Sequence, residues 1–435
     1  MYPLYTLLFA LAGLAMLPRL LWRDLRGAGY HRNLHERFGY GSARHMTLNA
    51  TQRCLWFHAA SVGEVQSLQP VITGLGQRFP HLPVAISTFT PAGKTTAQRA
   101  FPDAVAVFLL PLDLPWVMYR LVQRLQPQAL IVQETELWPH LFRAVSQHRV
   151  PIAVVNGRLS PRAFARYRWG RPFMRRVLSH VSLILAQSED SADRFLRLGA
   201  PSERVHVTGN TNIDRALLAA TQPAKPHTLA PLLHKNLIWV AGSTHEGEET
   251  TLLNVYRQLQ GQHPEIRLVL APRHLERTTT VVRHVQASGY RALRRSQYAS
   301  QHEQELEAST VLILDTLGEL ATLYSLCTVA FVGGSLIPVG GHNLLEPAVY
   351  AKPVVFGPYM QHFPDLAVML CEAGGAIQVQ NEADLCRSID HLLTHPEEGR
   401  SMGNQALRAL AANQGALHRT TQALTEMLKQ KKRAL

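Results

Sequence analysis

The chain has 435 residues, 46% of them hydrophobic, which is enough to bury two ordinary cores of about 150–200 residues each. Its four cysteines include no C-x-x-C pair, which argues against a disulfide framework and a structural zinc site. The net charge of +13 indicates an anionic partner: nucleic acid, an anionic membrane surface or a phosphorylated substrate.

The N-terminus is apolar. Met1 to Pro18 contains no charged side chain, and the apolar run continues beyond Arg19 through Leu20, Leu21 and Trp22. About 20 such residues span a bilayer as a helix. The arginines follow the apolar run instead of preceding it, unlike a signal peptide, and the positive-inside rule then leaves the rest of the chain in the cytosol. We predict a membrane anchor at residues 1–25. Because Pro18 interrupts the run, an interfacial helix is the alternative.

Short apolar runs alternate with helical segments through the first half of the chain. A helix is expected from Ser61 and another from about Gly93. Continuous apolar strands in such an alternation predict a parallel sheet covered on both faces. The predicted strands are Leu55–Ala59, Val84–Thr88, Ala104–Leu109, Ala129–Gln133, Ile152–Val155, Leu183–Ala186 and Val205–Thr208.

The second half repeats this pattern after a polar, proline-containing linker at about 215–235. We predict a first domain at 26–218, a second at 219–435, and functional loops at the carboxyl ends of their strands. The predicted strands are Leu237–Ala241, Arg267–Leu270, Val311–Leu314, Val329–Val332 and Pro353–Phe356.

Acidic residues follow two strands of the first half. Ser61-x-x-Glu64 has the spacing of a helix capping box, but Gly63 beside Glu64 would also let a bulky substrate reach a catalytic carboxylate. Glu134 and Glu136 follow another strand, and alternation would put them on the same side. They are either functional or part of a salt-bridged rim.

The segment from Arg162 to Val181 mixes arginines with Phe164, Tyr167, Trp169 and Phe173. Such a stretch could bind phosphates of a lipid headgroup while its aromatic rings lie at the membrane interface. The alternatives are a basic amphipathic helix with a solvated face and, ranked last, a surface that stacks on RNA bases. The apolar N-terminus favours the lipid.

The strand at Val329 to Val332 ends in Gly333 and Gly334, and a second pair, Gly340 and Gly341, precedes Asn343 and Glu346. Glycines let backbone N–H groups approach a phosphate, a helix N-terminus adds partial positive charge, and a carboxylate one turn later can bind ribose hydroxyls. The alternative is that Asn343 and Glu346 only cap the helix.

Two further loops of the second half follow strands. Pro272-Arg273-His274 offers a guanidinium to a phosphate or carboxylate, and Gly318 in Thr316-Leu317-Gly318-Glu319 would permit close approach to a flat base. Taken singly, Arg273 could be a surface ion pair and Gly318 an ordinary turn. Three such loops together favour a nucleotide.

Other nucleotide and metal sites are excluded by missing residues. Ala92-Gly93-Lys94-Thr95 lacks the earlier glycine of a P-loop, since position 88 is threonine. No strand opens into G-x-G-x-x-G, and the acids after His245 lack the second histidine of a metalloprotease. We expect no metal and no cofactor.

Several motifs, in this order and spacing, resemble the lipid A Kdo (3-deoxy-D-manno-octulosonic acid) transferases over the chain from its N-terminus to roughly residue 420. They are His58–Glu64, Glu134–Pro139, Asn156–Ser160, Ser243–Glu249, Phe331–Ser335 and Gly340–Asn343. The resemblance implies a GT-B fold, with two Rossmann-like domains facing across a cleft, at the cytoplasmic face of the inner membrane. It also implies CMP-Kdo as donor and a lipid A precursor (lipid IVA) as acceptor, in lipopolysaccharide core biosynthesis, with no nucleic acid.

By position, the resemblance makes Glu64 the general base of an inverting transfer and assigns Glu134 to transition-state stabilisation. It implies that CMP contacts Pro272, Arg273, Leu317, Gly318, Glu319, Asn343, Leu344, Leu345 and Glu346. One position departs from the family, because many relatives have lysine where this chain has Asn212. An amide cannot supply a full positive charge to a leaving phosphate. The alternatives are another membrane-associated GT-B enzyme that uses a UDP-sugar, and a non-catalytic lipid-binding homologue.

Overall fold

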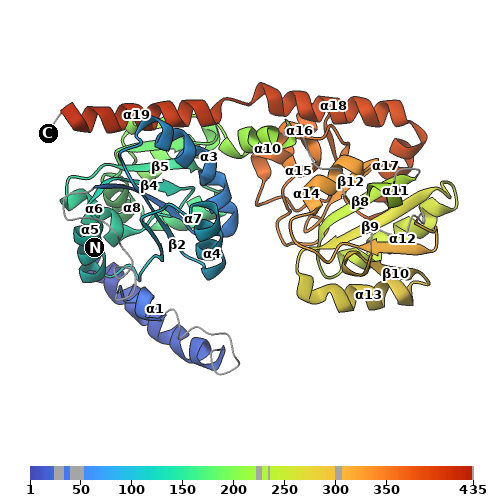
Figure 1. The fold of residues 1–435 in the computed structure, drawn as a ribbon, viewed down its shortest axis with the longest axis horizontal. Helices are drawn as coiled ribbons and strands as arrows, with labels where there is room; N and C mark the ends of the chain where they lie inside the picture. Colours follow the sequence, from blue (N-terminus) through green and yellow to red (C-terminus); the bar gives the residue numbers. More distant parts are fainter. Residues whose placement is uncertain (24–33, 40–52, 222–227, 234–235, 299–305, 434–435) are drawn as a thin grey trace. The chain divides into compact units, whose positions relative to one another are not determined.

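The computed structural model describes residues 1–23, 34–39, 53–221, 228–233, 236–298 and 306–433. The chain forms two compact α/β units (Figure 1). The first comprises Met1–Arg215 and Gln414–Leu435, and the second comprises Ala216–Asn413. The two predicted Rossmann-like units are therefore present.

The first unit contains a seven-stranded sheet in the order β3-β2-β1-β4-β5-β6-β7, and all its pairs are parallel. Its strands are β1 (Cys54–Ala59), β2 (Val84–Thr88), β3 (Ala106–Leu109), β4 (Pro127–Gln133), β5 (Ile152–Gly157), β6 (Leu183–Ala186) and β7 (Val205–Val207). Its helices are α1 (Tyr2–Arg23), α2 (Leu34–Arg37), α3 (Val62–Arg78), α4 (Pro91–Ala100), α5 (Pro115–Leu125), α6 (Pro139–Gln147), α7 (Pro161–Trp169), α8 (Arg171–Leu178), α9 (Glu189–Leu198), the first part of α10 (Thr211–Thr221), up to Arg215, and α19 (Ala416–Arg433).

The second unit also contains a parallel seven-stranded sheet, in the order β10-β11-β9-β8-β12-β13-β14. Its strands are β8 (Leu237–Thr244), β9 (Ile266–Pro272), β10 (Arg291–Arg294), β11 (Thr310–Ile313), β12 (Val329–Val332), β13 (Val354–Phe356) and β14 (Ala376–Gln378). Its helices are α11 (Ala230–Leu233), α12 (Glu248–Gln260), α13 (Thr278–Ala287), α14 (Leu320–Leu323), α15 (Leu345–Ala348), α16 (Pro364–Glu372), α17 (Glu382–Thr394) and α18 (Pro396–Ala412).

Both faces of each sheet are buried, as the continuous apolar strands predict. In β1, Trp56 packs into the core on one face while Leu55 and Phe57 pack into the core on the other. In the second unit, Trp239 and Val240 on β8 divide between two cores in the same way. Period-2 alternation within an all-apolar strand therefore serves two cores at once.

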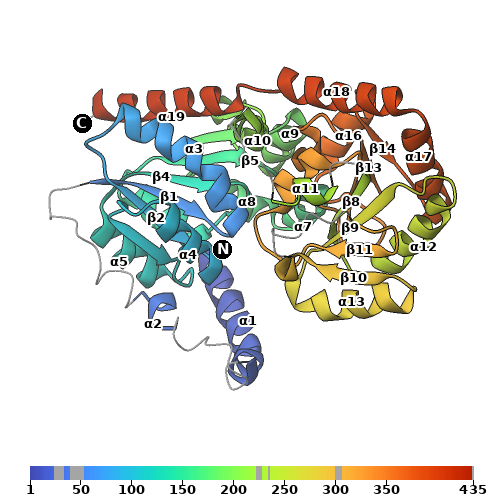
Figure 2. The same cartoon turned by 45° about the vertical axis from the view of Figure 1, so that its right-hand side comes forward.

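The final helix, α19, packs on the first unit and lies alongside α3 (Figure 2). Leu424 and Leu428 enter the core beside α3, and Arg78 donates a 3.0 Å hydrogen bond to Thr425. The predicted second domain, 219–435, included these last residues, because nothing local distinguishes the apolar face of α19 from that of α18. Part of the predicted linker is also helical, since α10 continues to Thr221.

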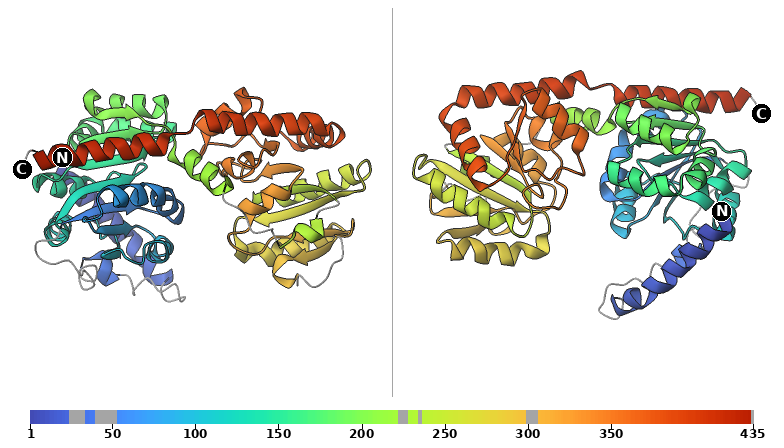
Figure 3. Two further views of the ribbon diagram at one scale, coloured as in Figure 1. Left: turned by 45° about the horizontal axis from the view of Figure 1, so that its top comes forward. Right: turned by 180° about the vertical axis from the view of Figure 1, so that it is seen from behind.

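Helix α1 forms where the anchor was predicted, and its first turns are docked on the first unit (Figure 3). Tyr5 donates to Asp113, Tyr2 hydrogen-bonds His180, and Thr6 hydrogen-bonds His140, at 2.8–3.0 Å. No helix among the described residues is long and apolar enough to cross a membrane. The prediction of a membrane-spanning anchor is therefore not supported. The polar side chains of the first turns are used for docking. Arg26 and Arg32 lie outside the described residues.

Candidate functional site

In the first unit, β1 and β4 are the neighbours at which the strand order reverses direction. Ligands of open parallel sheets bind at the carboxyl ends of strands at such a switch point. Glu64 follows β1, and Glu134 and Glu136 follow β4, so the topology brings the predicted acids to one edge of the sheet.

Glu64 has the capping role that its spacing predicts, and its catalytic role stays a prediction. It lies in the first turn of α3, where Ser61 is the N-cap, and its carboxylate accepts hydrogen bonds from the backbone N–H of Ala60 at 2.8 Å and from the Ser61 hydroxyl at 3.1 Å. Burial, followed by repulsion from Glu134, raises the pKa of Glu64 to about 7. The space beside Gly63 is open. A carboxylate with a pKa near neutrality is suited to general-base catalysis.

Glu134 lies beyond the end of β4 and has a left-handed backbone conformation, with φ +56°. The prediction that strand alternation aligns Glu134 with Glu136 is therefore wrong, because the chain turns at that point. Proximity brings the acids together instead, since both Glu134 and Glu136 act electrostatically on Glu64. Burial raises the pKa of Glu134, while the guanidinium of Arg158 opposes that shift.

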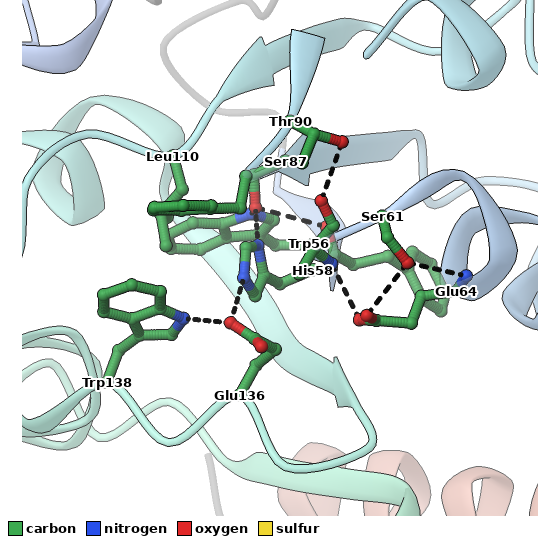
Figure 4. Close-up of polar contacts among 12 residues, drawn as sticks. Trp56, His58, Ser61, Glu64, Ser87, Thr90, Leu110, Glu136 and Trp138 are labelled. Carbon is green, nitrogen blue, oxygen red and sulfur yellow. Dashed lines mark hydrogen bonds and ion pairs between the residues drawn. The ribbon is translucent and has the colours of Figure 1, made fainter. Parts of the chain in front are cut away.

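A buried polar chain, which the sequence did not reveal, supports Glu136 (Figure 4). Trp56 and His58 both hydrogen-bond the hydroxyl of Ser87, at 2.8 and 2.9 Å, and His58 Nε2 lies 3.8 Å from a carboxylate oxygen of Glu136. Trp138 donates to the same carboxylate oxygen at 3.0 Å. His58 lies beside Ser87 because of the register between β1 and β2, which the sequence of β1 alone does not reveal.

In the second unit, the strand order reverses at β8 and β12. The glycine-rich loop after β12 does not offer its N–H groups to a phosphate. The carboxylate of Glu248, fully buried at the start of α12, accepts from the backbone N–H groups of Gly334, Ser335 and Leu336, and from that of His245, at 2.7–3.0 Å. The prediction of a phosphate cradle at Gly333–Ser335 is therefore wrong, because a protein carboxylate occupies it.

The second glycine pair precedes a single helical turn, α15. Asn343 lies before this turn, and its side-chain oxygen accepts from the N–H of Leu345 at 3.2 Å, so it acts as a cap. Leu344 and Leu345 are buried, whereas Asn343 and Glu346 are partly exposed. Glu346 also acts electrostatically on the buried Tyr324. Of the four residues predicted to contact CMP here, two have polar side chains that solvent can reach.

Arg273 follows β9 and is exposed. Its backbone N–H donates to the carbonyl of Thr244 at 2.9 Å, which ties the loop after β9 to the end of β8. Within the described parts of the chain, its guanidinium makes no hydrogen bond or ion pair, which argues against the surface ion pair considered above. Pro272, the last residue of β9, is buried.

The neighbouring Arg277 has a different role. It forms a two-pronged ion pair with Glu249 at 2.8 and 3.2 Å, and Glu249 is fully buried and also accepts from Thr244. The acids after His245 therefore organise the loops of this unit. Sequence spacing could not identify these partners. Arg277 is 28 residues from Glu249, and the N–H groups of the glycine-rich loop are 86–88 residues from Glu248.

The loop after β11 is open on one side. The Leu317 side chain is 84% exposed, and no heavy atom of a described residue lies within 4 Å of where a Cβ on Gly318 would be. Glu319 accepts from Arg295 at 3.0 Å and from Thr316. An exposed apolar side chain beside an open glycine suits a flat base, and the contact with CMP stays a prediction.

The arginine-rich segment folds into α7 and α8. Phe164 and Met174 pack into the core, while Trp169 is 91% exposed. Phe173 lies against Tyr2 and Tyr5 of α1, with ring centroids 5.4 and 5.5 Å apart. Part of the aromatic pattern therefore serves packing, and part of it docks α1.

Asn212 lies in the first turn of α10, where its N–H donates to the side chain of Asn210 at 3.0 Å. The carboxylate of Asp214 accepts from the N–H groups of Gly415 and Leu417 at the start of α19. This segment thus joins the two parts of the first unit.

Comparisons with known proteins agree with this arrangement. A family model described as 3-deoxy-D-manno-octulosonic-acid transferase (kdotransferase) matches residues 32–215. A 3-deoxy-D-manno-octulosonic acid transferase of Haemophilus influenzae is 36% identical over 403 residues, covering 91% of each chain. The chain belongs to the Kdo transferase family.

The likeness extends over nearly the whole of this Kdo transferase family member. A 3-deoxy-D-manno-octulosonic acid transferase of Bordetella pertussis is 33% identical over 435 residues, covering 98% of this chain and 99% of that protein. Among solved structures, the UDP-GlcNAc 2-epimerase of Neisseria meningitidis has a TM-score of 0.61 at 18% identity, covering 86% of this chain and 100% of that one. This structural likeness shows two α/β domains of the glycosyltransferase GT-B type, and family membership makes the protein a glycosyltransferase.

Proposed function

We propose that the protein transfers Kdo from CMP-Kdo to a lipid A precursor (lipid IVA) in lipopolysaccharide core biosynthesis. The observation that carries this proposal is Glu64: a partly buried carboxylate at a sheet switch point, beside open space, with its pKa raised to about 7. Relatives that are 33–36% identical and span nine-tenths or more of the chain are named Kdo transferases, which supports the choice of sugar.

In the proposed reaction, ionised Glu64 accepts the proton of an acceptor hydroxyl as that oxygen attacks the anomeric carbon of Kdo. The bond from that carbon to the phosphate oxygen breaks, and CMP leaves with the electron pair. Attack from the face opposite to the leaving group inverts the anomeric centre. General-base help of this kind contributes about 10²–10⁴ in rate. Glu134, which lies close enough to Glu64 to influence its ionisation, would stabilise positive charge developing on the sugar.

The donor is proposed to bind the second unit at the ends of β9, β11 and β12. Arg273, whose guanidinium has no partner in the described part of the chain, would bind an anionic group of the donor. Leu317 and Gly318 would lie against the cytosine, and Glu346 would accept from ribose hydroxyls. No metal is expected. The single group of three potential metal ligands found in the described residues is the exposed set His391, His395 and Glu398, at the junction of α17 and α18.

The acceptor is a lipid, and α1 supports a location on the cytoplasmic face of the inner membrane. Leu4, Leu7, Leu8 and Leu11 are exposed by 52–60%, while Tyr2, Tyr5 and Thr6 face the protein. An exposed leucine ridge on a docked helix, with Arg143 of α6 and Arg176 of α8 nearby, suits a helix lying in the interface plane. Sedimentation with anionic vesicles tests this: Leu7→Asp with Leu11→Asp should release the protein, whereas Thr95→Asp on α4 should not.

The direct test of function is to incubate purified protein with CMP-Kdo and a tetraacylated lipid A precursor, and to determine the masses of the products. Addition of Kdo is expected, and Glu64→Ala should abolish it. Competition of CMP and UMP for binding distinguishes a cytidine donor from a uridine donor. Absence of product from both wild type and Asn212→Lys would favour a non-catalytic lipid-binding protein.

A further inference from the structure

Two histidines, from loops that are 97 residues apart in sequence, lie in contact at the switch point of the second unit. His245 follows β8 and His342 follows β12, and their rings stack with centroids 5.1 Å apart and planes within 6°. Their Nε2 atoms are 2.8 Å apart. One imidazole must therefore donate its Nε2–H and the other must accept it, so the two rings share a single proton at this contact.

The backbone is built around this pair. A Cβ at position 334 would lie 2.9 Å from Cδ2 of His342 and 3.4 Å from Cδ2 of His245, and Gly334 has φ +65°. Only glycine lets the loop after β12 pass so close to the two rings. The glycine that the sequence assigned to a phosphate thus accommodates histidines, while the N–H groups of its loop bind Glu248.

The surroundings of the pair are rich in cationic groups. The pKa of His342 is lowered to about 4, mainly by burial. The electrostatic effects of four neighbours add to this: His245, Arg273, His362 and His274. The pKa of His245 is also lowered, by burial, His274, Arg277 and Arg273, against an opposing effect of Glu249. The nearby carboxylates are engaged elsewhere: Glu249 by Arg277, Glu248 by backbone N–H groups, and Glu276 lies 3.7 Å from His274.

We propose that His245, His342 and Arg273 form an anion-binding subsite that takes the phosphodiester or the carboxylate of the sugar-nucleotide donor, and that the histidine pair gains one proton when the anion binds. In the proton balance, solvent protonates Nδ1 of the ring that donates its Nε2–H, and the resulting imidazolium keeps that hydrogen bond. This subsite rests on the donor role proposed above for the identity of the anion.

A metal is a poorer occupant than an anion. Among the described residues, no third ligand atom joins His245 and His342 in a group within 4.8 Å, and the neighbouring Arg273 would repel a cation. An anion supplies the negative charge that the cluster lacks and favours the protonated form of the pair.

The experiment is calorimetry on the full-length protein with the methyl ester of CMP, a phosphodiester. Unlike CMP, it has no ionisation near pH 6 that would confuse the proton count. Titrations in two buffers of different ionisation enthalpy, between pH 6 and 8, report the protons taken up. We expect uptake, with affinity increasing by up to about tenfold per unit fall in pH. Neutral cytidine should show neither effect.

His342→Gln and His245→Gln should each abolish proton uptake and weaken diester binding about tenfold, leaving cytidine binding unchanged. His391→Gln, which removes an exposed histidine elsewhere in the same unit, is the matched control and should behave as wild type. If the diester binds without proton uptake, and with equal affinity in wild type and all these variants, the proposed subsite is wrong. The donor role of the second unit would still stand.

A second measurement does not require nucleotide recognition. Sulfate, compared with chloride at equal ionic strength and pH 6, should raise the unfolding temperature of wild type more than that of His342→Gln. If the nucleotides fail to bind but this difference persists, the donor proposal fails and the subsite stands. If sulfate protects both proteins equally, the subsite is wrong.

Discussion

The two units have the same sheet design but opposite charge at their switch points. In the first unit, the loops after β1 and β4 bring together Glu64, Glu134 and Glu136. In the second unit, the loops after β8, β9 and β12 bring together His245, His342 and Arg273. The sheets thus provide equivalent positions, and the loops alone determine the chemistry at each.

Crowding of like groups has opposite consequences in the two places. Among the carboxylates, burial and repulsion raise the pKa of Glu64, so this residue can accept a proton near neutral pH. Among the imidazoles, burial and repulsion lower the pKa values of His245 and His342, so an anion can restore a proton there. Shifted pKa values are typical of functional sites. They occur here at both switch points, as expected if one site accepts a proton and the other binds the anionic donor.

The largest expected effect concerns the acidic switch point. Glu64→Gln should lower kcat by about 10²–10⁴, because an amide cannot accept the proton of the acceptor hydroxyl. The amide oxygen can still accept the hydrogen bond from Ala60, so the fold should persist. Steady-state transfer assays, with circular dichroism as a check on folding, provide the measurement.

Ser61→Ala is the matched control, since it removes the helix cap but leaves the base. It should cost about 1 kcal/mol of stability and only a small part of the rate. Because the pKa of Glu64 is raised, its contribution to folding is complete below its ordinary value and is lost as pH rises through about 7. When pH rises from 4 to 8, wild type should therefore lose this contribution while Glu64→Gln does not. The difference in unfolding free energy should shift in favour of Glu64→Gln. Equal transfer rates for wild type and Glu64→Gln would leave the cap as the residue's only role.

The next effect tests whether the glycine-rich loop serves the fold. Glu248→Ala leaves four N–H groups without their acceptor and should lower the free energy of unfolding by about 3 kcal/mol or more. Urea denaturation measures this loss. A variant that keeps its stability and binds nucleotide more tightly would restore the phosphate cradle predicted from the sequence, because its N–H groups would then be free for a phosphate.

Two arginines four positions apart sharpen the distinction between binding and folding. Arg273→Ala should change stability by no more than about 0.5 kcal/mol, since its guanidinium has no partner among the described residues, but should raise the KM for donor about 10–100-fold. Arg277→Ala should destabilise the protein by about 3–5 kcal/mol, because it leaves the buried Glu249 unpaired. Melting curves and donor titrations of both variants test the pair, and a reversed pattern would contradict the assignment.

The smallest effect is on pH dependence. In the proposed reaction the ionised form of Glu64 is the active one, so kcat/KM should fall as pH drops through about 7. Glu134→Gln should move this limb to lower pH, because repulsion from Glu134 is the largest electrostatic cause of the raised pKa. Glu136→Gln should move it less. If the fall in kcat/KM occurs at the same pH in wild type and in both variants, Glu134 and Glu136 do not influence the ionisation of Glu64.

The sequence predicted what local pattern determines. Most of the buried strands begin and end within two residues of their predicted limits, because apolar runs and turn residues mark them. β10 and β14 were missed, since each is a short edge strand whose polar or exposed residues lack that signal. The capping at Ser61 and Glu64 was readable from a spacing of three.

Contacts between distant segments were not readable. The acceptor for the N–H groups of Gly334 is Glu248, 86 residues away, and no pattern in either segment identifies the other. His245 and His342 were each within a quoted motif, but only the pairing of β8 with β12 brings them into contact. Similarly, the polar residues in the first turns of α1 gain meaning only from partners such as Asp113.

The division of roles is tested most directly by measuring donor affinity and single-turnover rate in the same two variants. Glu64→Gln should bind CMP-Kdo as wild type does but transfer Kdo at least 100-fold more slowly, by roughly the general-base contribution. Arg273→Ala should bind the donor weakly and, at saturating donor, transfer it at a rate near that of wild type. If Glu64→Gln loses donor affinity without losing the rate of transfer, the acidic switch point is not the catalytic one and the account is wrong.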